Sequence, residues 1–427
     1  MTTFKIVKLA RFCSRCLYLA VWACLLLGHL QHYQLTGKIS FYAHDVFIGL
    51  LLLINLPQLS GYLSQVVAWV NNKITCRGKL LALFFTIVII TAWLCQPLDR
   101  VLVAWLYLLR SLAYILFGWL FCREQFFTVK QKKQIMTSFL LLFVLVSYAQ
   151  YIFLPDLTFL GYLGWDDHLG RMVGTWFDPA FCGLVLIFVS IYFFSLKQFV
   201  SWRYLISGAA LLAVGLTFSR ANYLALLVAM IFFGGSNLLW LKKFWRSLYV
   251  LMFVLGVILG GSWLLPISQQ HLTNSLWRTH SVIIRFQSAK AQWQDLSLKD
   301  YLLGRGLFVA AAEGVHGERL VSKQFIRPPA NTPVIVHQTA NFSDNLLILL
   351  ISFFGIPLTL IIIFYIGKFL FYCWRVARAA FFYTLCLLVN AQFNQAVFQP
   401  LVLLTFTTLL YLDLWEHNFG MDGKLNK

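Results

Sequence analysis

Long apolar segments are the feature that most constrains this chain. The run LFFTIVIITAWL begins at Leu83, and LLILLISFFGIPLTLIIIFYI begins at Leu346. An apolar stretch of about 20 residues without charges can cross a bilayer as a helix, because a helix satisfies its own backbone polar groups there. Hydrophobic residues make up 60% of the 427 residues, which is more than a soluble core requires. The sequence therefore predicts an all-α polytopic membrane protein.

About twelve transmembrane helices are predicted, with one long connection between the ninth and the tenth. The chain then divides into a membrane domain with spans 1–9 (residues 1–265), a large outer loop (266–343), and spans 10–12 with a cytoplasmic tail (344–427). The predicted spans are residues 16–32, 41–58, 80–95, 101–122, 135–154, 180–196, 204–219, 222–238, 247–265, 344–366, 381–396 and 397–413.

The distribution of basic residues predicts the orientation. They concentrate in the connections on one side, as in KQKK from Lys130 and LKKFWR from Leu241. The short connections on the other side hold only Lys38, Arg100, Arg171 and Arg220. Because Lys and Arg accumulate in cytoplasmic connections, both termini are predicted to be cytoplasmic. This bias explains most of the net charge of +19, so no nucleic-acid partner is inferred.

The outer loop is too long to be a simple connection. Its first half repeats an apolar face at Val282, Phe286, Ala289 and Trp293. This spacing predicts an amphipathic helix that lies on the membrane or caps a cavity. The second half, FIRPPANTPVIVHQTANFSDN from Phe325, is rich in Pro, Asn and Thr and predicts irregular structure.

Arginines mark the candidate polar sites. Arg110 lies near the middle of the predicted fourth span, where an arginine must face a polar cavity or a partner. It is therefore a substrate-binding residue, one half of a helix-packing ion pair, or, in a longer span, a residue that snorkels to the interface. Arg171, Arg220 and Arg285 lie on the predicted outer side near helix ends. Because the guanidinium group binds phosphate bidentately, these three predict an anion site, with lipid headgroup contact as the alternative.

Carboxylates are scarce on the predicted outer side. Asp178 and Asp344 each begin a predicted span, so each either caps a helix N-terminus or serves the site directly. Asp166 and Asp167 beside His168 are metal-ligand types, but no other ligand spacing supports a metal. No metal and no cofactor is predicted.

Four segments, in order along the chain, resemble the O-antigen ligase and polymerase superfamily of membrane glycosyltransferases. They are GRMVGTWFDPAFCG from Gly170, LTFSRANYLALL from Leu216, RFQSAKAQWQDLSLKDYLLGRGL from Arg285, and SDNLLILLISFFGIPL from Ser343. We refer to them as the first to the fourth segment. The resemblance covers residues 165–366, and the earlier residues only as spans.

The resemblance implies a metal-independent glycosyltransferase with a GT-C-like fold in the bacterial inner membrane. Its donor would be a glycan on undecaprenyl pyrophosphate. An acceptor hydroxyl would attack the anomeric carbon, and the lipid pyrophosphate would leave. The implied partners are this lipid-linked glycan, membrane lipids, and a chain-length regulator and a flippase of the same pathway.

Roles for individual residues also follow from the resemblance. Arg220 and Arg285 correspond to the phosphate side of the site, with Arg171 next, because fixed arginines stabilise the charge of a leaving pyrophosphate. Trp176 of the first segment is expected in the interface belt or stacked on sugar rings. Asn345 of the fourth segment and Asp178 are expected to contact substrate.

The general base is left open between two residues. Ligases of the superfamily commonly have a histidine at the position of Asp344, eleven residues before Gly355. This departure favours a polymerase of repeat units over a ligase that passes polymer to lipid A core. Either Asp344 or His337 would then take the acceptor proton.

Two other classes of function remain as alternatives. A transporter or flippase would show repeated halves with broken spans, and no such pair is evident in the sequence. A different lipid-linked glycosyltransferase could use GWDDHLG, from Gly164, for acid–base chemistry.

Overall fold

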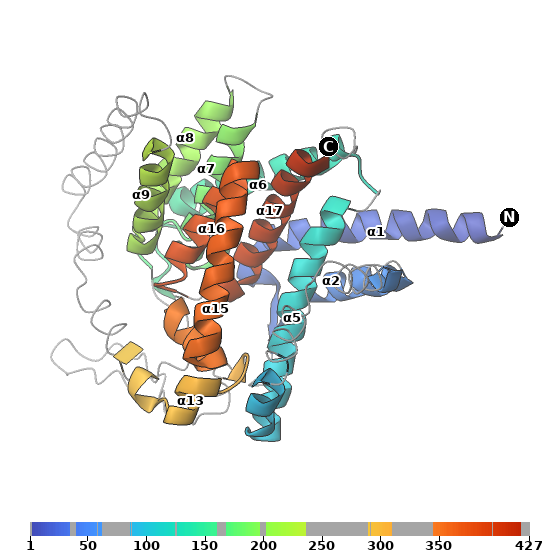
Figure 1. The fold of residues 1–427 in the computed structure, drawn as a ribbon. Coiled ribbons are helices and arrows are strands. Elements are labelled where there is room, and N and C mark those ends of the chain that lie inside the picture. The colour runs from blue at the N-terminus through green and yellow to red at the C-terminus, as the bar shows by residue number, and fades with distance from the viewer. Residues whose placement is uncertain are drawn as a thin grey trace, which may run out of the picture.

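The computed structural model describes residues 2–34, 40–57, 59–61, 86, 88–123, 126–159, 168–196, 202–235, 289–290, 292–309, 345–394 and 396–419. These residues are mostly helical (Figure 1). The named α-helices are α1 (Thr2–Leu27), α2 (Ala43–Ile54), α5 (Leu98–Arg123), α6 (Val129–Phe153), α7 (Pro179–Ser195), α8 (Trp202–Leu216), α9 (Arg220–Gly235), α13 (Leu298–Leu303), α15 (Leu346–Val376), α16 (Arg378–Asn390) and α17 (Pro400–Phe419). Three short 3₁₀-helices are η1 (Gly28–Gln31), η3 (Gly174–Trp176) and η6 (Ala396–Phe398).

Several helices have the length and composition of membrane spans. Within the described residues, four are long and apolar enough to cross a bilayer: Arg11–Gln31, Leu98–Cys122, Val129–Phe153 and Leu346–Val376. Shorter apolar helices include α2, α7, α8, α9 and α16. The chain is thus mostly helical, with apolar helices that suit a membrane. The count of twelve spans and the GT-C-like arrangement stay predictions, and the predicted span 247–265 lies outside the described residues.

A small β-hairpin interrupts the helices and was not predicted. Strands β1 (His32–Gln34) and β2 (Ser40–Tyr42) pair antiparallel, with Tyr33 opposite Phe41. The hairpin connects η1 to α2. Its strands are only three residues long, so the hydropathy pattern contains no alternation from which it could be recognised.

Helix α15 differs from the predicted span 344–366 in two ways. It continues to Val376, and at Gly355 its backbone is not helical (φ 71°, ψ 173°). The extension carries charged residues whose heads lie over aromatic rings one turn earlier: Lys368 is 4.9 Å from the ring centroid of Phe364, and Arg375 is 4.3 Å from that of Phe371. The helix therefore continues past the end of the apolar run that hydropathy detects.

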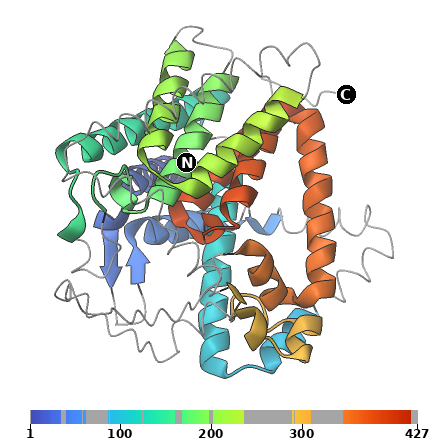
Figure 2. The ribbon, with the colours of Figure 1, turned by 90° about the vertical axis from the view of Figure 1, so that its left-hand side faces the viewer.

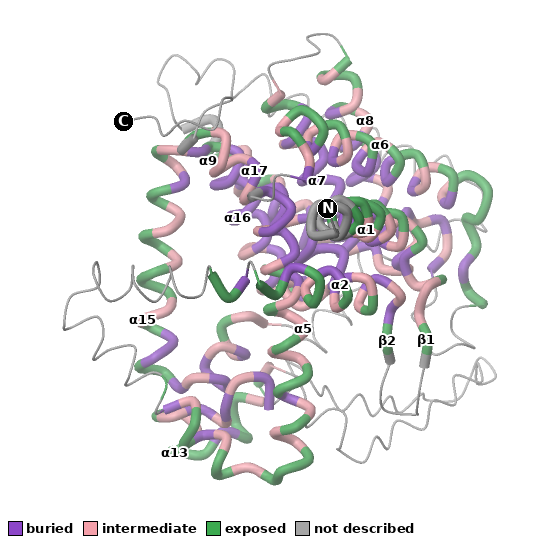
Figure 3. The backbone as a smooth tube through the Cα atoms, turned by 90° about the vertical axis from the view of Figure 1, so that its right-hand side faces the viewer, coloured by how far each residue is buried: buried purple, intermediate pink, exposed green. Residues whose placement is uncertain are grey.

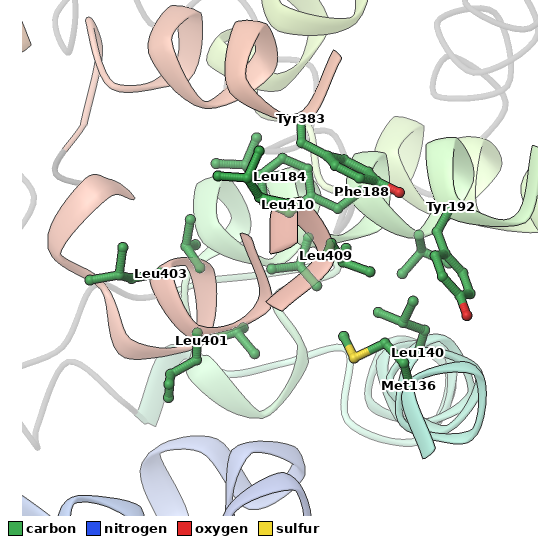
Figure 4. Packing of buried hydrophobic residues seen from close by; sticks show 14 of the residues in the cluster. Met136, Leu140, Leu184, Phe188, Tyr192, Tyr383, Leu401, Leu403, Leu409 and Leu410 are labelled. Carbon is green, nitrogen blue, oxygen red and sulfur yellow. The ribbon is translucent and has the colours of Figure 1, made fainter. Parts of the chain in front are cut away.

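Helix α7 lies at the centre of the main hydrophobic core. It is apolar on all sides and almost entirely buried, as expected for a helix that other helices surround. It packs against α8, α9, α16 and α17. Buried stretches gather where α7 and α16 meet (Figure 3). There the ring of Phe188 meets that of Tyr383 edge-on, with centroids 5.7 Å apart (Figure 4).

The short helix α13 lies beside α15 (Figures 1 and 2). The indole N–H of Trp93, just before α5, donates to the carbonyl of Leu307, just after α13 (3.1 Å). The described part of the outer loop, residues 289–290 and 292–309, is therefore packed on the helices.

Candidate functional site

The first segment packs on the turn that belongs to the second segment. The guanidinium group of Arg171 donates from Nε to the carbonyl of Thr217 and from Nη2 to that of Phe218, both at 3.1 Å. This turn leads directly into α9, which begins at Arg220. The fold thus brings Arg171 and the start of α9 together, although the two arginines are far apart in the sequence.

A glutamine from α6 supports the backbone of the first segment. The Oε1 atom of Gln150 accepts from the amides of Val173 (2.9 Å) and Gly174 (3.1 Å), and its Nε2 atom donates to the carbonyl of Leu154 (3.0 Å). Gly174 has a φ of +61°, a conformation that favours glycine. The glutamine thus pairs with two backbone amides that have no partner from regular secondary structure in this buried, irregular segment.

Asp178 caps the N-terminus of α7. Its Oδ1 atom accepts from the amides of Ala180 (2.7 Å) and Phe181 (3.0 Å), and Pro179 occupies the first turn. This is the capping role that the sequence left open for Asp178, since an aspartate there satisfies amides without intrahelical partners.

Trp176 has a different place from the one expected. Its side chain is 1% exposed, and its indole N–H donates to the carbonyl of Leu25 (2.8 Å). The neighbouring Thr175 hydroxyl donates to Leu26 (2.7 Å). Both carbonyls belong to the last turn of α1, where helix carbonyls lack partners. The prediction of an interface-belt or sugar-stacking Trp176 is therefore wrong, because the ring is buried against α1.

Arg110 forms an ion pair between two helices. From the middle of α5 it contacts Asp45 of α2 twice: Nη2 to Oδ2 at 2.8 Å and Nε to Oδ1 at 3.2 Å. Its Nε atom also lies 2.6 Å from the hydroxyl of Tyr114, which donates to Asp45. Of the interpretations of Arg110, the geometry shows the helix-packing ion pair. Asp45 was not singled out, although a carboxylate inside a predicted span is itself a signal.

Three buried asparagines connect α7, α9 and α16. Asn222 donates to the carbonyl of Pro179 (3.0 Å) and accepts from Asn390 (2.5 Å). Asn390 in turn accepts from Asn394 (2.5 Å). All three side chains are buried. We call this set the asparagine chain; it joins the first and second segments to the turn after α16.

The fourth segment meets the same turn. Asn345 caps α15 by accepting from the amide of Ile348 (3.1 Å), and its Nδ2 atom donates to the carbonyl of Gln392 (3.4 Å). The amide of Leu346 donates to the carbonyl of Ala391 (3.1 Å). The start of α15 therefore rests on the turn after α16, which carries Asn394 of the asparagine chain.

The third segment meets the fourth one at the break in α15. The amide of Arg305, in the GRG sequence after α13, donates to the carbonyl of Ser352 (2.7 Å). Gly304 and Gly355 approach the facing backbone closely. All four segments are thus linked in one connected set of contacts.

Several predicted residues lie outside the described part of the chain. These are Arg285, His337 and Asp344 among the candidate catalytic residues, and Asp166 and Asp167 of the alternative acid–base loop. Of the predicted amphipathic helix, residues 289–290 and 292–295 are helical. The predicted positions Val282 and Phe286 lie outside the described residues.

The sequence reasoning missed Gln150, Asn390 and Asn394. A signal was present for the last two, because NAQFNQ from Asn390 is a run of amides between two apolar segments. Polar side chains in apolar helices commonly hydrogen-bond to neighbouring helices. Nothing in the sequence around Gln150 indicates which backbone it supports.

The fold and the site define a helical protein with apolar helices of membrane-spanning length, a set of buried amides, and half-buried arginines. Comparisons with protein families, with curated proteins and with solved structures find no match to this chain.

Proposed function

We propose that this protein polymerises glycan repeat units carried on undecaprenyl pyrophosphate, by glycosyl transfer at the outer face of the bacterial inner membrane. The product would be a surface polysaccharide such as O-antigen, capsule or exopolysaccharide. One observation carries the proposal. The four segments that resemble the superfamily are spread over residues 170–358, yet their described parts are linked. The first segment contacts the second, the third contacts the fourth, and the end of α16 with the turn after it connects the two pairs.

The proposed reaction balances without a cofactor. An acceptor hydroxyl attacks the anomeric carbon of the donor glycan, and the bond from that carbon to the pyrophosphate oxygen breaks. The acceptor proton goes to a base, for which Asp344 and His337 are the candidates. The electron pair leaves with the pyrophosphate, and the charge that develops there is what Arg220, Arg171 and Arg285 would stabilise.

The arrangement around Arg171 supports a preorganised anion site. Its guanidinium group donates to the carbonyls of Thr217 and Phe218, which fix its orientation at the turn before α9. Arg110 is paired with Asp45, which makes it a weaker candidate for binding phosphate. We therefore assign donor binding to Arg171 and Arg220.

A ligase of the same superfamily is the second candidate, and aspartate instead of histidine at position 344 favours the polymerase. A transporter or flippase is a third. The break in α15 at Gly355 is one feature of transporters, but these usually pair two broken helices in repeated halves. No second broken helix is found among the described helices.

Deletion of the gene in a Gram-negative host separates these functions. Loss of a polymerase should leave lipid A core that carries a single repeat unit, whereas loss of a ligase should leave polymer on the undecaprenyl carrier. Loss of a flippase should leave repeat units at the cytoplasmic face. Gel analysis of lipopolysaccharide and mass spectrometry of the carrier lipid read out the result. Unchanged glycans in both fractions would contradict the proposed function.

A further inference from the structure

At the break in α15, the described part of the outer loop packs against the backbone of the helix. Gly355 is non-helical and Pro357 follows it, so the residues before the break, Leu346–Phe354, form a separate half-helix. A proline inside a helix removes one backbone hydrogen bond, and a break at this point makes room for a second backbone. The GRG sequence at residues 304–306 occupies that place.

Two glycines make the contact between these backbones possible. A Cβ atom on Gly304 (φ +74°) would lie 2.4 Å from the carbonyl oxygen of Phe353, and one on Gly355 (φ +71°) would lie 2.5 Å from that of Leu302. Any side chain at either position would collide with backbone. Because both glycines also have positive φ, only glycine suits both positions.

Arg305, between the two glycines of GRG, bonds to the half-helix through its backbone and to other residues of the loop through its side chain. Its amide donates to the carbonyl of Ser352 (2.7 Å). Its side chain donates from Nε to Oδ2 of Asp300 (3.2 Å) and from Nη2 to Oδ2 of Asp295 (2.8 Å). The Arg305 and Asp300 side chains are only 17% and 15% exposed, so solvent screens this pair less than a surface pair.

The ionisation of Asp300 suits this role. Burial alone would raise the pKa of the Asp300 carboxyl, but hydrogen bonds from Ser297 and Arg305 bring its pKa below the ordinary value. The carboxylate is therefore charged at neutral pH, and the ion pair with Arg305 is present under physiological conditions.

An aromatic cluster completes the attachment. The ring of Phe308, just after GRG, lies 5.4 Å from that of Phe353 on the half-helix and 5.2 Å from that of Phe398 in η6. Aromatic pairs at such distances add stability beyond their buried area. The loop thus contacts the half-helix near the break, through Phe353. At the opposite end of the half-helix, Asn345 donates to the carbonyl of Gln392.

We propose that Arg305 is a positioning residue for the transfer step. Together with Gly304 and Gly355, it fixes the half-helix so that the start of α15, at Asn345, stays in place for the reaction. Among the described residues, donor binding is assigned to Arg171 and Arg220, which lie on other elements. The inference rests on the proposed function, and it divides the site into a donor-binding part and a part that the loop positions.

The division predicts a split between kcat and KM. In purified protein reconstituted in nanodiscs, Arg305→Ala should lower kcat about 10- to 100-fold, because small misplacements at a reacting centre cost this much. The KM for the donor should stay within about twofold, because the donor arginines are untouched. The probe is the lipid-linked repeat unit isolated from the deletion strain. Arg305→Lys should recover part of kcat, and Asp300→Asn should show a smaller loss.

A second measurement does not depend on activity. Amide hydrogen exchange of residues 350–358 should become at least about tenfold faster in Arg305→Ala, since local opening governs exchange. Lys299→Ala, an exposed position of α13, is the matched control and should change neither quantity. If Arg305→Ala does not fold, the same two measurements are made on Asp300→Asn, which weakens the contact of Arg305 with Asp300.

The outcomes separate two failures. An active wild type whose Arg305→Ala variant keeps its kcat, or raises the donor KM as much as it lowers kcat, would overturn the positioning role alone. Unchanged exchange at residues 350–358 would do the same. A wild-type protein that transfers no glycan would overturn the proposed function, and the role of Arg305 in it.

Discussion

Replacing Arg220 with glutamine should lower kcat for glycan transfer by about 100- to 1,000-fold, the usual cost of removing one preorganised group that stabilises developing charge. Arg220 begins α9, and the turn before it holds Arg171 through the carbonyls of Thr217 and Phe218. Glutamine keeps most of the side-chain length but loses the charge that a leaving pyrophosphate requires. The melting temperature should stay within a few degrees of wild type, as for most substitutions outside the core.

The control for this experiment is Lys299→Gln, which removes a positive charge from an exposed position of the outer loop. It should retain wild-type turnover. Equal losses in the two variants would mean that overall charge steers the substrate and that Arg220 has no specific role. A fully active Arg220→Gln variant would remove the phosphate-side assignment altogether.

The largest effect on stability is expected at the ion pair between Asp45 and Arg110. Asp45→Ala should lower the free energy of unfolding by about 3 kcal/mol, because it leaves a charge without its partner inside a helix bundle. Arg110 is 27% and Asp45 13% exposed, so partial solvation keeps the cost at the lower end of the range. The double variant Asp45→Asn with Arg110→Met should come within about 1 kcal/mol of wild type, since neither charge remains.

Denaturant titration in detergent micelles measures this cycle. The comparison variant is Glu416→Gln, which breaks the more exposed pair with Lys133 (2.7 Å; 22% and 34% exposed). It should cost about 0.5 kcal/mol, as exposed pairs do. A double variant as unstable as Asp45→Ala alone would show that the cost does not come from an unpaired Arg110, and that Asp45 stabilises the protein through its other contacts, with Tyr42 and Tyr114.

The sequence predicted the start of a helix most closely where a local signal coincides with the beginning of the apolar run. The predicted span 180–196 corresponds to α7 at Pro179–Ser195, because Asp178 and Pro179 are a start signal that can be read locally. The span 135–154 corresponds to α6, which begins earlier, at Val129. There the capping box of Thr128 and Gln131 starts the helix in a charged stretch that hydropathy does not include.

The candidate site was predicted less well than the helices. Residue type alone identified Arg171 and Asp178 as candidate polar residues, because charged residues are rare in this sequence and these two lie at the end of an apolar run. It did not identify partners: Asp45 and Arg110 are 65 residues apart, and Asn222 and Asn390 are 168 apart. Such pairs depend on how helices pack, and no local pattern in one sequence records that packing. Trp176 was misassigned for the same reason, because its partner carbonyl lies on α1.

The most direct test of the proposed function is glycan transfer by the purified protein alone. The protein in nanodiscs is incubated with the lipid-linked repeat unit from the deletion strain, and the lipids are analysed by mass spectrometry. We predict carrier lipids that hold two or more repeat units, with one undecaprenyl pyrophosphate released for each new linkage. Unchanged single-unit lipid, with no released undecaprenyl pyrophosphate, would contradict the proposal.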